Sequence, residues 1–321
     1  MKLYIPIYLQ IAAPAPFRMT KHLSLKRKTG LYNERGKHMN KLISLLIALG
    51  LIFGSVPCIA LIFDTAAYAD EDVHLSDEQK LEVLDDLEPD LLKNISGEYV
   101  TRGDVIDILY KMYYDEKPAY DMPEDERLYS DVTDGKLHYK MIMVNYIGES
   151  QFINGVGDRI FRPNSNCKLS EFIKFSFGLG GLQNSAKKIA EQNNCEIYPY
   201  GYMKYAEKAG LINVGENPDR YITRDEVRTI LSKVIFEKIT EPIYYCVRDH
   251  EEGDPILTRL YGLKMKCGTV KIISDEQFMV DDKRIDGTIS NDLNDSKVLV
   301  LYYDDVTSND LYKVFSKKAR L

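Results

Sequence analysis

The sequence predicts an α+β protein, with mainly helical segments as far as about residue 240 and a small β-rich module in residues 241–321. Apolar residues at helical spacing, which follow three similar capping motifs, indicate the helical part. Short runs of β-branched and aromatic residues, separated by turns rich in Asp and Asn, indicate the β-rich part. With 321 residues, of which 45% are hydrophobic, the chain is too long for one small core, so we expect more than one compact unit.

Charge separates the first 69 residues from the rest. Residues 1–69 carry nine Lys and Arg and two acids, a net charge of +7, whereas residues 70–321 carry 33 basic and 47 acidic residues, a net charge of −14. A body this acidic repels nucleic acid and anionic membranes, because its long-range field has the same sign as theirs. The charge therefore predicts no nucleic-acid partner.

An uncharged apolar run of 22 residues, 42–63, follows Lys41 and precedes Ala67 and Ala69 in an A-x-A pattern. This order of a basic flank, an apolar segment and a small-residue cleavage site is the layout of a secretory signal peptide. We therefore expect residues 39–69 to be a signal peptide and the protein to be secreted. A run of 22 residues is also long enough to span a bilayer. An uncleaved N-terminal anchor is thus the alternative, and only this segment would then contact the membrane.

The start of translation is a separate question. Met39-Asn-Lys41 has the features of a natural start, directly before the apolar run. Residues 1–38 would then be an upstream mis-start, the reading we favour, and the alternative is a basic N-terminal extension.

Three segments of the helical part open with the same device, Thr101-Arg-Gly-Asp104, Lys168-Leu-Ser-Glu171 and Thr223-Arg-Asp-Glu226. In the first and the last, we expect the Thr to accept a hydrogen bond at the helix N-terminus. The acid three residues later, Asp104 or Glu226, should reach back to the backbone N–H of the Thr. Apolar residues then follow on one helix face. These are Val105, Ile108, Leu109 and Met112, then Phe172, Phe175 and Leu179, then Val227, Ile230, Leu231, Val234 and Ile235.

The segments around these caps also repeat. The pieces are Tyr129-Ser-Asp-Val132, Phe152-Ile-Asn-Gly155, Gly157-Asp-Arg-Ile-Phe-Arg-Pro-Asn164 and Ile222-Thr-Arg-Asp-Glu-Val227. Together they resemble the S-layer homology repeats of bacterial surface proteins, whose pattern is roughly F-x-D-V, a Trp-containing helix, G-I-I-x-G, D-G-x-F-x-P-N and I-T-R-A-E-F. The resemblance covers residues 81–236, about half of the chain. The stretch that begins at Tyr198 is similar to the third repeat of clostridial-type surface proteins.

The resemblance implies three mainly α-helical repeats in a pseudo-threefold unit within residues 75–240, at about 75–115, 127–180 and 190–238. It also implies binding of secondary cell-wall polysaccharide, often through a pyruvylated sugar. The expected location is the cell wall or cell surface of a Gram-positive-type bacterium.

The resemblance further implies a set of glycan-binding residues, Arg102, Arg224, Lys168, Asp131, Tyr139, Gly155, Gly157 and Tyr202. The two Arg would clamp a carboxylate beside helix N-termini whose N–H groups are free, and Lys168 would act as a point charge. The acid and the glycines would shape a groove, and one of the two Tyr would stack on a sugar. The alternative is structural, with Arg102 and Arg224 pairing with acids to hold adjacent repeats together.

The chain departs from the family pattern at three places. Lys168-Leu169 stands where the family has Thr-Arg, Tyr139 stands where it has Trp, and Asp104 stands where it has Glu. At most two of the three equivalent positions therefore keep the Arg.

From about Glu241 the chain changes character. Runs at 263–273, 277–280 and 297–303 are rich in β-branched and aromatic residues and are separated by acidic turns. They predict a small β module of four or five short strands.

Catalytic motifs are absent from the sequence. It has no G-x-S-x-G, no H-E-x-x-H and no P-loop, and its five His are scattered. Around His250 a solvated acidic loop is favoured over a metal site. Cys167, Cys195, Cys246 and Cys267 form no C-x-x-C pair, and the sequence does not assign a disulfide between them. We therefore predict a non-catalytic protein without a cofactor or metal. The alternative is an exported cell-wall-active enzyme, or its accessory subunit, with an unrecognised site in the β module.

Overall fold

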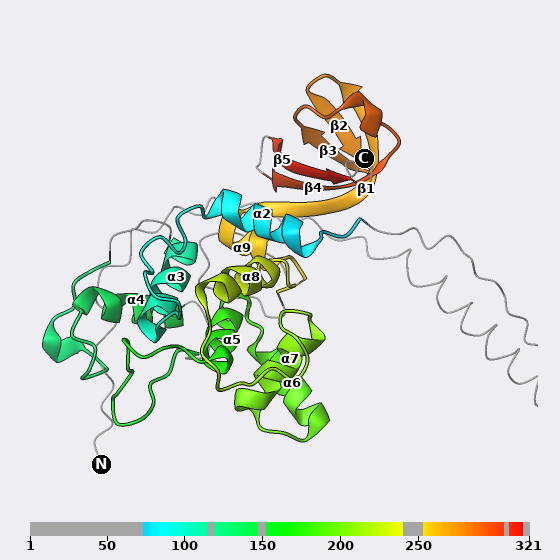
Figure 1. Ribbon diagram of the computed structural model, residues 1–321. Coiled ribbons are helices and arrows are strands. Elements are labelled where there is room, and N and C mark those ends of the chain that lie inside the picture. The colour runs from blue at the N-terminus through cyan, green and yellow to red at the C-terminus, as the bar shows by residue number, and fades with distance from the viewer. Residues whose placement is uncertain (1–72, 115–118, 147–151, 240–252, 305–307, 317–321) are drawn as a thin grey trace, which may run out of the picture. The chain divides into compact units, whose positions relative to one another are not determined.

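The computed structural model describes residues 73–114, 119–146, 152–239, 253–304 and 308–316 (Figure 1). The predicted basic extension, the signal peptide or anchor, and His250 lie outside the described residues. Residues 70–321 form one compact unit. It contains both α-helices and a five-stranded barrel, so the predicted α+β class is confirmed. None of the helices in the described ranges is long and apolar enough to cross a membrane.

The helices of the described residues are α2 (Asp77–Leu87), α3 (Arg102–Tyr114), α4 (Gly135–Tyr146), α5 (Leu169–Phe177), α6 (Gln183–Asn193), α7 (Tyr202–Lys208), α8 (Arg224–Val234) and α9 (Ile256–Tyr261). Short 3-10 turns lie at Glu124–Glu126, Gly178–Gly180 and Asn291–Leu293, and a π-type turn lies at Ile197–Gly201. Helices α3, α5 and α8 each begin directly after one of the three predicted cap residues.

Both predicted capping boxes are present. At the start of α3, the backbone N–H of Thr101 donates to Oδ2 of Asp104 at 2.8 Å, and Thr101 Oγ1 accepts from the N–H of Asp104 at 3.1 Å. At the start of α8, Thr223 and Glu226 form the same reciprocal pair at 2.9 and 3.4 Å. The Thr and the acid thus satisfy N–H groups that would otherwise have no partner within the helix.

Helix α5 begins with half of such a box. The N–H of Lys168 donates to Oε2 of Glu171 at 3.0 Å, but a lysine side chain has no acceptor to offer in return. The predicted apolar stripe is buried, and two of its residues, Phe172 and Phe175, belong to α5. Leu179 is also buried, in the 3-10 turn that follows.

The residues directly before the three caps form a closed cycle of backbone hydrogen bonds. The N–H of Val100 donates to the carbonyl of Ile222 at 3.1 Å, and that of Ile222 to the carbonyl of Cys167 at 3.1 Å. The N–H of Cys167 donates back to the carbonyl of Val100 at 2.8 Å. The cycle joins the starts of α3, α5 and α8, which lie far apart in the sequence.

The first N–H group of each of these helices is bonded around the same cycle. The bonds run from Arg102 to Ser165, from Leu169 to Arg220 and from Arg224 to Glu98, at 2.9, 2.8 and 3.2 Å. The second N–H groups of α3 and α5 also donate to neighbouring carbonyls, those of Pro163 and Pro218. The expectation of free N–H groups is therefore wrong for the first two positions of α3 and α5 and for the first position of α8, because the adjoining segment supplies their acceptors.

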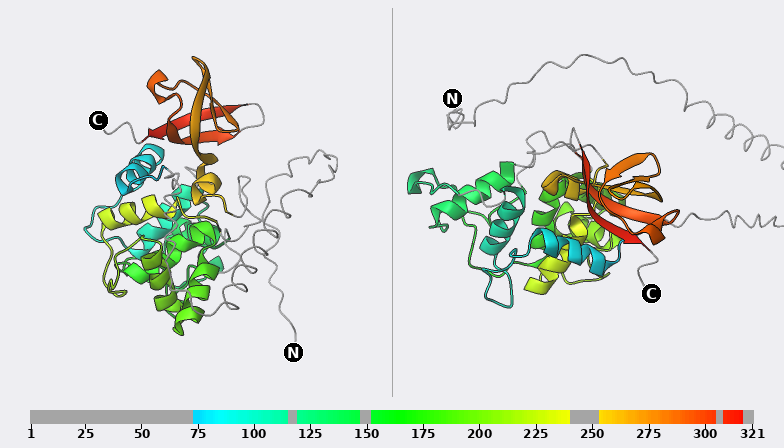
Figure 2. Two further views of the ribbon diagram at one scale, coloured as in Figure 1. Left: turned by 90° about the vertical axis from the view of Figure 1, so that its right-hand side faces the viewer. Right: turned by 90° about the horizontal axis from the view of Figure 1, so that it is seen from above.

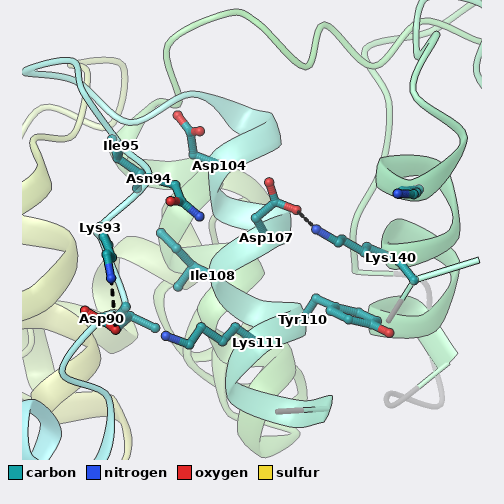
Figure 3. Close-up of a pocket in the computed structure, with 13 residues that line it drawn as sticks. Asp90, Lys93, Asn94, Ile95, Asp104, Asp107, Ile108, Tyr110, Lys111 and Lys140 are labelled. Carbon is teal, nitrogen blue, oxygen red and sulfur yellow. Dashed lines mark hydrogen bonds and ion pairs between the residues drawn. The ribbon is translucent and has the colours of Figure 1, made fainter. Parts of the chain in front are cut away.

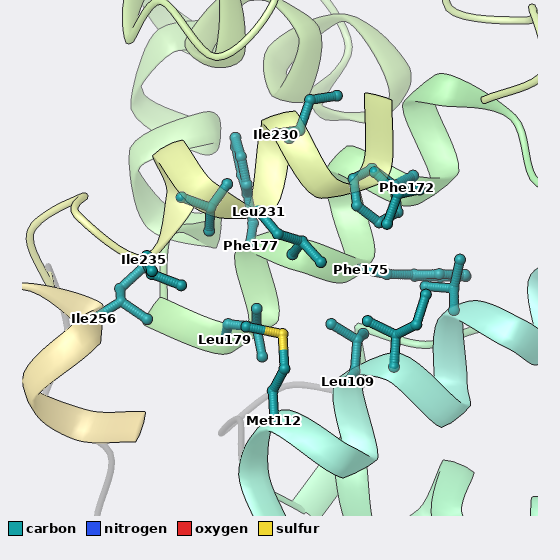
Figure 4. Packing of buried hydrophobic residues seen from close by; sticks show 14 of the residues in the cluster. Leu109, Met112, Phe172, Phe175, Phe177, Leu179, Ile230, Leu231, Ile235 and Ile256 are labelled. Atoms are coloured by element: carbon teal, nitrogen blue, oxygen red, sulfur yellow. The ribbon is translucent and has the colours of Figure 1, made fainter. Parts of the chain in front are cut away.

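The buried faces of the helices share one core. Its members include the predicted stripes of α3, α5 and α8, all of them 4% exposed or less. Figure 4 shows Leu109 of α3, Phe172 of α5, Leu231 of α8 and Ile256 of α9 meeting there. The apolar spacing read from the sequence therefore marks the faces that the fold buries.

The β-rich part is a closed barrel in the order β1-β2-β3-β5-β4. Figure 2 shows its strands, in orange and red, from two further sides. The strands are β1 (Leu263–Ser274), β2 (Gln277–Val280), β3 (Lys283–Asp286), β4 (Lys297–Asp304) and β5 (Asn309–Ser316). β1 pairs with both β2 and β4, and β3 pairs with β5 in parallel. The three predicted strands match β1, β2 and β4, whereas β3 and β5 were not predicted individually.

Strand β4 is buried on both faces, which explains its continuous apolar run. Val298, Val300 and Tyr302 belong to the core inside the barrel, and the alternating Leu299 and Leu301 belong to the helical core. Helix α9 lies just before β1, so the segment predicted as β-rich, 241–321, also contains a helix.

Candidate functional site

The hydrogen-bonded cycle creates three junctions at which one segment meets the next. At the first, Arg102 is 3% exposed and its guanidinium is fully engaged. Nε donates to the carbonyl of Phe161 at 2.8 Å, Nη2 donates to the carbonyl of Asn154 at 2.9 Å, and Nη1 pairs with Glu171. The guanidinium also lies over the rings of Phe161 and Phe175, 4.5 and 5.4 Å from their centroids. Arg102 therefore joins α3 to α5, as in the structural alternative.

At the second junction, Leu169 takes the position that Arg102 has at the first, and it brings no charge. The acid of the next helix, Glu226, pairs instead with Arg220, whose Nη2 lies 2.8 Å from its Oε1. Arg220 also donates from Nε to Glu216 at 2.7 Å. Arg220 thus supplies the cation that Leu169 does not provide at this junction.

At the third junction, Arg224 has few partners. Its Nη2 donates to the carbonyl of Leu92 at 3.5 Å, the limit for a hydrogen bond, and its Nε is buried with no acceptor. The acid of the next helix is Asp104, which is one methylene shorter than Glu171. Its Oδ2 accepts from the hydroxyl of Thr101 at 2.7 Å, within its own cap.

A cavity of about 200 Å³ lies beside the first junction. Its lining comes from the start of α3, the loop before α5, α5 itself and the π-type turn. The lining residues are Arg102, Asn154, Gly155, Val156, Glu171, Lys174, Phe175 and Tyr198. We call this cavity the Lys174 cavity.

Lys174 supplies the available cation of this cavity. With its amide oxygen turned toward Lys174, Asn154 accepts from Nζ at 2.9 Å. The ammonium also lies 5.3 Å from the ring centroid of Tyr198, which is 40% exposed. Among the described residues, no carboxylate lies within ion-pair distance of Lys174.

Burial lowers the pKa of the Lys174 ammonium, because a partly desolvated cation is disfavoured. The positive charge of Arg102 lowers this pKa further, and the carboxylate of Glu171 opposes the shift. An anion in the cavity would relieve the same unfavourable charge. The electrostatics of the cavity therefore favour a negatively charged group.

The wall of the cavity at Gly155 depends on a close approach of backbone. A Cβ at this position would lie 2.4 Å from the carbonyl oxygen of Ile160 and 2.6 Å from the ring of Tyr129. The N–H of Gly155 donates to the hydroxyl of Tyr129 at 3.1 Å. Gly155 thus shapes the cavity wall.

Asp131 holds the same loop through hydrogen bonds to its backbone. Its two oxygens accept from the N–H groups of Phe161 and Arg162, at 2.8 and 2.6 Å. Gly157 has φ of +111° and an open side, so it serves the turn and does not line the cavity. Both residues support the loop that carries Gly155.

The remaining predicted residues lie away from the cavity. Lys168 pairs with Asp219 at 2.7 Å on the surface. Tyr139 packs with Tyr110 and Tyr120, at centroid distances of 6.5 and 6.1 Å.

Tyr202 requires a correction. The ring is 5% exposed and lies 5.7 Å from the ring of Phe177 and 6.4 Å from that of Tyr198. A buried ring presents no free face to a sugar. The exposed Tyr198, four residues earlier, lines the cavity instead.

A second cavity, of about 590 Å³, lies between α3, α4 and the segment before α3 (Figure 3). Asp104, Asp107 and Ile108 line it from the third, sixth and seventh positions of α3. The same three positions of α5 line the Lys174 cavity. The sixth position is Asp107 in α3 and Lys174 in α5, so the two cavities have opposite charges at this position. Asp107 pairs with Lys140 at 2.5 Å. Burial raises the pKa of Asp107.

Sequence reasoning did not single out Lys174, Asn154 or Tyr198 as site residues. Asn154 belongs to the Phe152–Gly155 motif, and Lys174 lies one turn after the cap acid Glu171. These positions, beside a repeated motif and a cap acid, could have marked Asn154 and Lys174 as candidate site residues. The contact with Tyr198 arises only in the folded chain.

No model of a protein family matches the chain, and no curated protein matches it either. Among the described residues, no group of three or more His, Cys, Asp or Glu is placed to hold a metal ion. The function is therefore argued from the geometry of the junctions and the Lys174 cavity.

Proposed function

We propose that the protein is a non-catalytic cell-surface protein that attaches to the cell wall by binding an anionic secondary cell-wall polysaccharide. Residues 75–240 would act as three repeats of the S-layer homology type, and a pyruvylated sugar would be the bound unit. The Lys174 cavity is the binding site in this proposal.

The cyclic hydrogen bonds support an arrangement of three repeats. Val100, Cys167 and Ile222 hold equivalent positions before their caps, and each donates to the next in one direction. The first N–H groups of α3, α5 and α8 form a second set of three bonds, which runs around the three segments in the opposite direction. Three related segments around a common axis would produce both sets of bonds.

The Lys174 cavity is the observation that carries the proposed ligand. It combines a cation without a carboxylate partner, an exposed amide at Asn154 and an exposed aromatic ring at Tyr198. An acidic sugar needs each of these, for its charge, its hydroxyl groups and its apolar ring face. The small volume suits one ring of a longer polymer.

The same cavity favours binding over turnover. Its carboxylate, Glu171, accepts from Arg102 and from the N–H of Lys168, so it is held by two donors. A general acid or base must be free to exchange a proton with the substrate. We therefore propose that the cavity holds its ligand without cleaving it.

Sedimentation with purified cell walls of the producing bacterium tests the proposal. We expect Lys174→Gln to lower the bound fraction at least fivefold, because the substitution removes the charge and keeps a polar side chain. Lys187→Gln, an exposed substitution on α6, is the matched control and should bind like the parent. Equal binding by the parent and Lys174→Gln would refute the role of this cavity.

Walls from which the polysaccharide has been removed provide the second arm. The parent should bind intact walls and fail to bind stripped walls. Binding to both would point to peptidoglycan and would overturn the proposed ligand. Release of soluble sugar from intact walls by the purified protein would overturn the proposal of a non-catalytic role.

A further inference from the structure

The residues directly before the three members of the hydrogen-bonded cycle are exposed. Val100, Cys167 and Ile222 are fully buried, and side chains alternate between the two sides of an extended backbone. Their predecessors therefore lie on the opposite side of the cycle, the side that faces solvent. These predecessors are Tyr99, Asn166 and Tyr221. Two of the three equivalent positions thus expose an aromatic ring.

Backbone bridges determine what lies beside these two rings. Tyr99 is bridged to Thr223 and Tyr221 to Lys168, both in antiparallel geometry. Residues paired in this way have their side chains on the same face. The rings of Tyr99 and Tyr221 meet edge to face, with their centroids 5.9 Å apart. With exposures of 38% and 49%, they form one aromatic surface, which we call the tyrosine pair.

The polar groups beside the tyrosine pair are balanced in charge. Nζ of Lys168, the bridge partner of Tyr221, lies 2.7 Å from Oδ1 of Asp219. Both side chains are exposed, so their remaining donor and acceptor sites face water. An uncharged sugar needs this combination, an apolar face for its ring and both donors and acceptors for its hydroxyl groups. The tyrosine pair therefore favours an uncharged sugar, whereas the Lys174 cavity favours an acidic one.

Lys168 also lies near the Lys174 cavity, through Tyr198. The hydroxyl of Tyr198, which lines the cavity, lies 3.3 Å from Oγ of Ser170, and Lys168 is the cap residue of the same helix. Burial raises the pKa of the Tyr198 hydroxyl, and the hydrogen bond with Ser170 and the charge of Lys168 oppose this shift. Lys168 is therefore a neighbour both of Tyr198 in the cavity and of Tyr221 in the tyrosine pair.

We propose that the tyrosine pair is a second sugar subsite, which stacks on an uncharged sugar of the polymer whose acidic unit occupies the Lys174 cavity. The inference rests on the proposed function. A cavity of about 200 Å³ holds one ring, so the rest of the polymer passes over the surface beside it. A second sugar on the same polymer adds contact area after the first has already been held in place, which strengthens binding at little further cost. The tyrosine pair would therefore make the protein prefer the polymer over its single acidic sugar.

Calorimetry with fragments of the wall polysaccharide tests this subsite. The probes are the single acidic sugar and a four-sugar fragment that ends in it, both prepared from the purified polysaccharide of the producing bacterium. The parent should bind the four-sugar fragment about tenfold more tightly, which corresponds to about 1.4 kcal/mol. Tyr221→Ala should lose this gain and bind the single sugar like the parent. Tyr221→Phe keeps the ring and should keep the gain.

Tyr303→Ala is the matched control. The ring of Tyr303 is 39% exposed and meets Tyr312 edge to face at 6.0 Å, but it lies in the barrel. This variant should bind both probes like the parent, at a temperature where all the proteins are folded. Because the chain has no Trp, tyrosine absorption gives a second readout, and the four-sugar fragment should perturb it less in Tyr221→Ala than in the parent. An equal gain in the parent and in Tyr221→Ala, or no gain in the parent, would overturn the inference.

The two proposals fail in different ways. If Lys174→Gln lowers wall binding but Tyr221→Ala keeps the full gain for the longer fragment, the subsite is refuted and the proposed function stands. If the parent binds neither walls nor fragments, the proposed function is refuted and the inference falls with it.

Discussion

Arg102 and Glu171 form a largely buried ion pair between α3 and α5, with side-chain exposures of 4% and 16%. The residues are 69 positions apart in the sequence, and each is also bound to backbone, Arg102 through two carbonyls and Glu171 through the N–H of Lys168. The pair therefore connects two caps and the loop that lines the Lys174 cavity. The stability of the fold and the shape of the proposed site therefore both depend on this ion pair.

Removal of Arg102 should destabilise the protein strongly. Arg102→Met leaves Glu171 partly buried without its cation, and breaking such a pair costs about 3–5 kcal/mol of unfolding free energy. Urea unfolding followed by circular dichroism measures the loss. A second substitution, Glu171→Gln, should restore part of it, because Gln still accepts from the N–H of Lys168. If the double variant lost the sum of both single effects, the two residues would not be coupled.

The stability of the protein should fall in mild acid because of His138. This residue is fully buried, and its Nε2 accepts from the N–H of Leu128 at 2.7 Å. Burial lowers the pKa of the His138 imidazole, and the nearby charges of Arg127 and Arg159 lower it further.

The direction in which the unfolding free energy changes with pH follows from which state of the protein, folded or unfolded, binds the proton. Below pH of about 6.5 the unfolded chain protonates His138 while the folded protein does not, so the unfolding free energy falls as the pH falls. The slope from this residue is at most about 1.4 kcal/mol per pH unit. Urea unfolding between pH 7.5 and 5 measures it. His138→Gln should reduce the slope, and the exposed control His74→Gln should leave it unchanged. An equal slope in both variants would contradict the assignment.

As the pH rises, wall binding should weaken at a lower pH than it would if the binding cation were a fully exposed lysine. Burial and the charge of Arg102 lower the pKa of Lys174. The ammonium that meets the anion is therefore lost below the ordinary lysine range, which lies near pH 10.4. Sedimentation with walls from pH 7 to 10.5 measures the midpoint. Lys174→Arg keeps its charge throughout, and retention by this variant at pH 10 would support the mechanism. Constant binding by the parent over the whole range would exclude it.

Gly155→Ala should disturb the cavity wall. The new Cβ would meet the carbonyl oxygen of Ile160 at 2.4 Å, and backbone cannot move aside as a flexible side chain does. We expect a loss of about 1–3 kcal/mol in unfolding free energy and weaker binding to walls. Thermal unfolding and sedimentation, the latter at a temperature where both proteins are folded, measure the two effects. An unchanged Tm would show that the loop tolerates the methyl group.

Local structure followed closely from the sequence. The cap motifs at Thr101 and Thr223 fixed where α3 and α8 begin, because a Thr and an acid three residues later satisfy the first N–H groups from within the segment. The continuous run of β4 was recognised because it is buried on both faces. In contrast, β3 and β5 are short or alternate weakly with polar residues, and their pairing with each other joins segments distant in sequence. Periodicity within one strand does not reveal such a pairing.

The sequence by itself determined the class of the fold, the helix starts and the buried stripes, because these depend on residues within about ten positions of one another. Only the tertiary structure decided which arginine is engaged. Arg102 and Arg224 follow the same kind of cap, yet one pairs with Glu171 and the other donates to the carbonyl of Leu92 at 3.5 Å. These partners lie on segments that are distant in the sequence. Which charges remain available for a ligand was therefore set by contacts between distant residues.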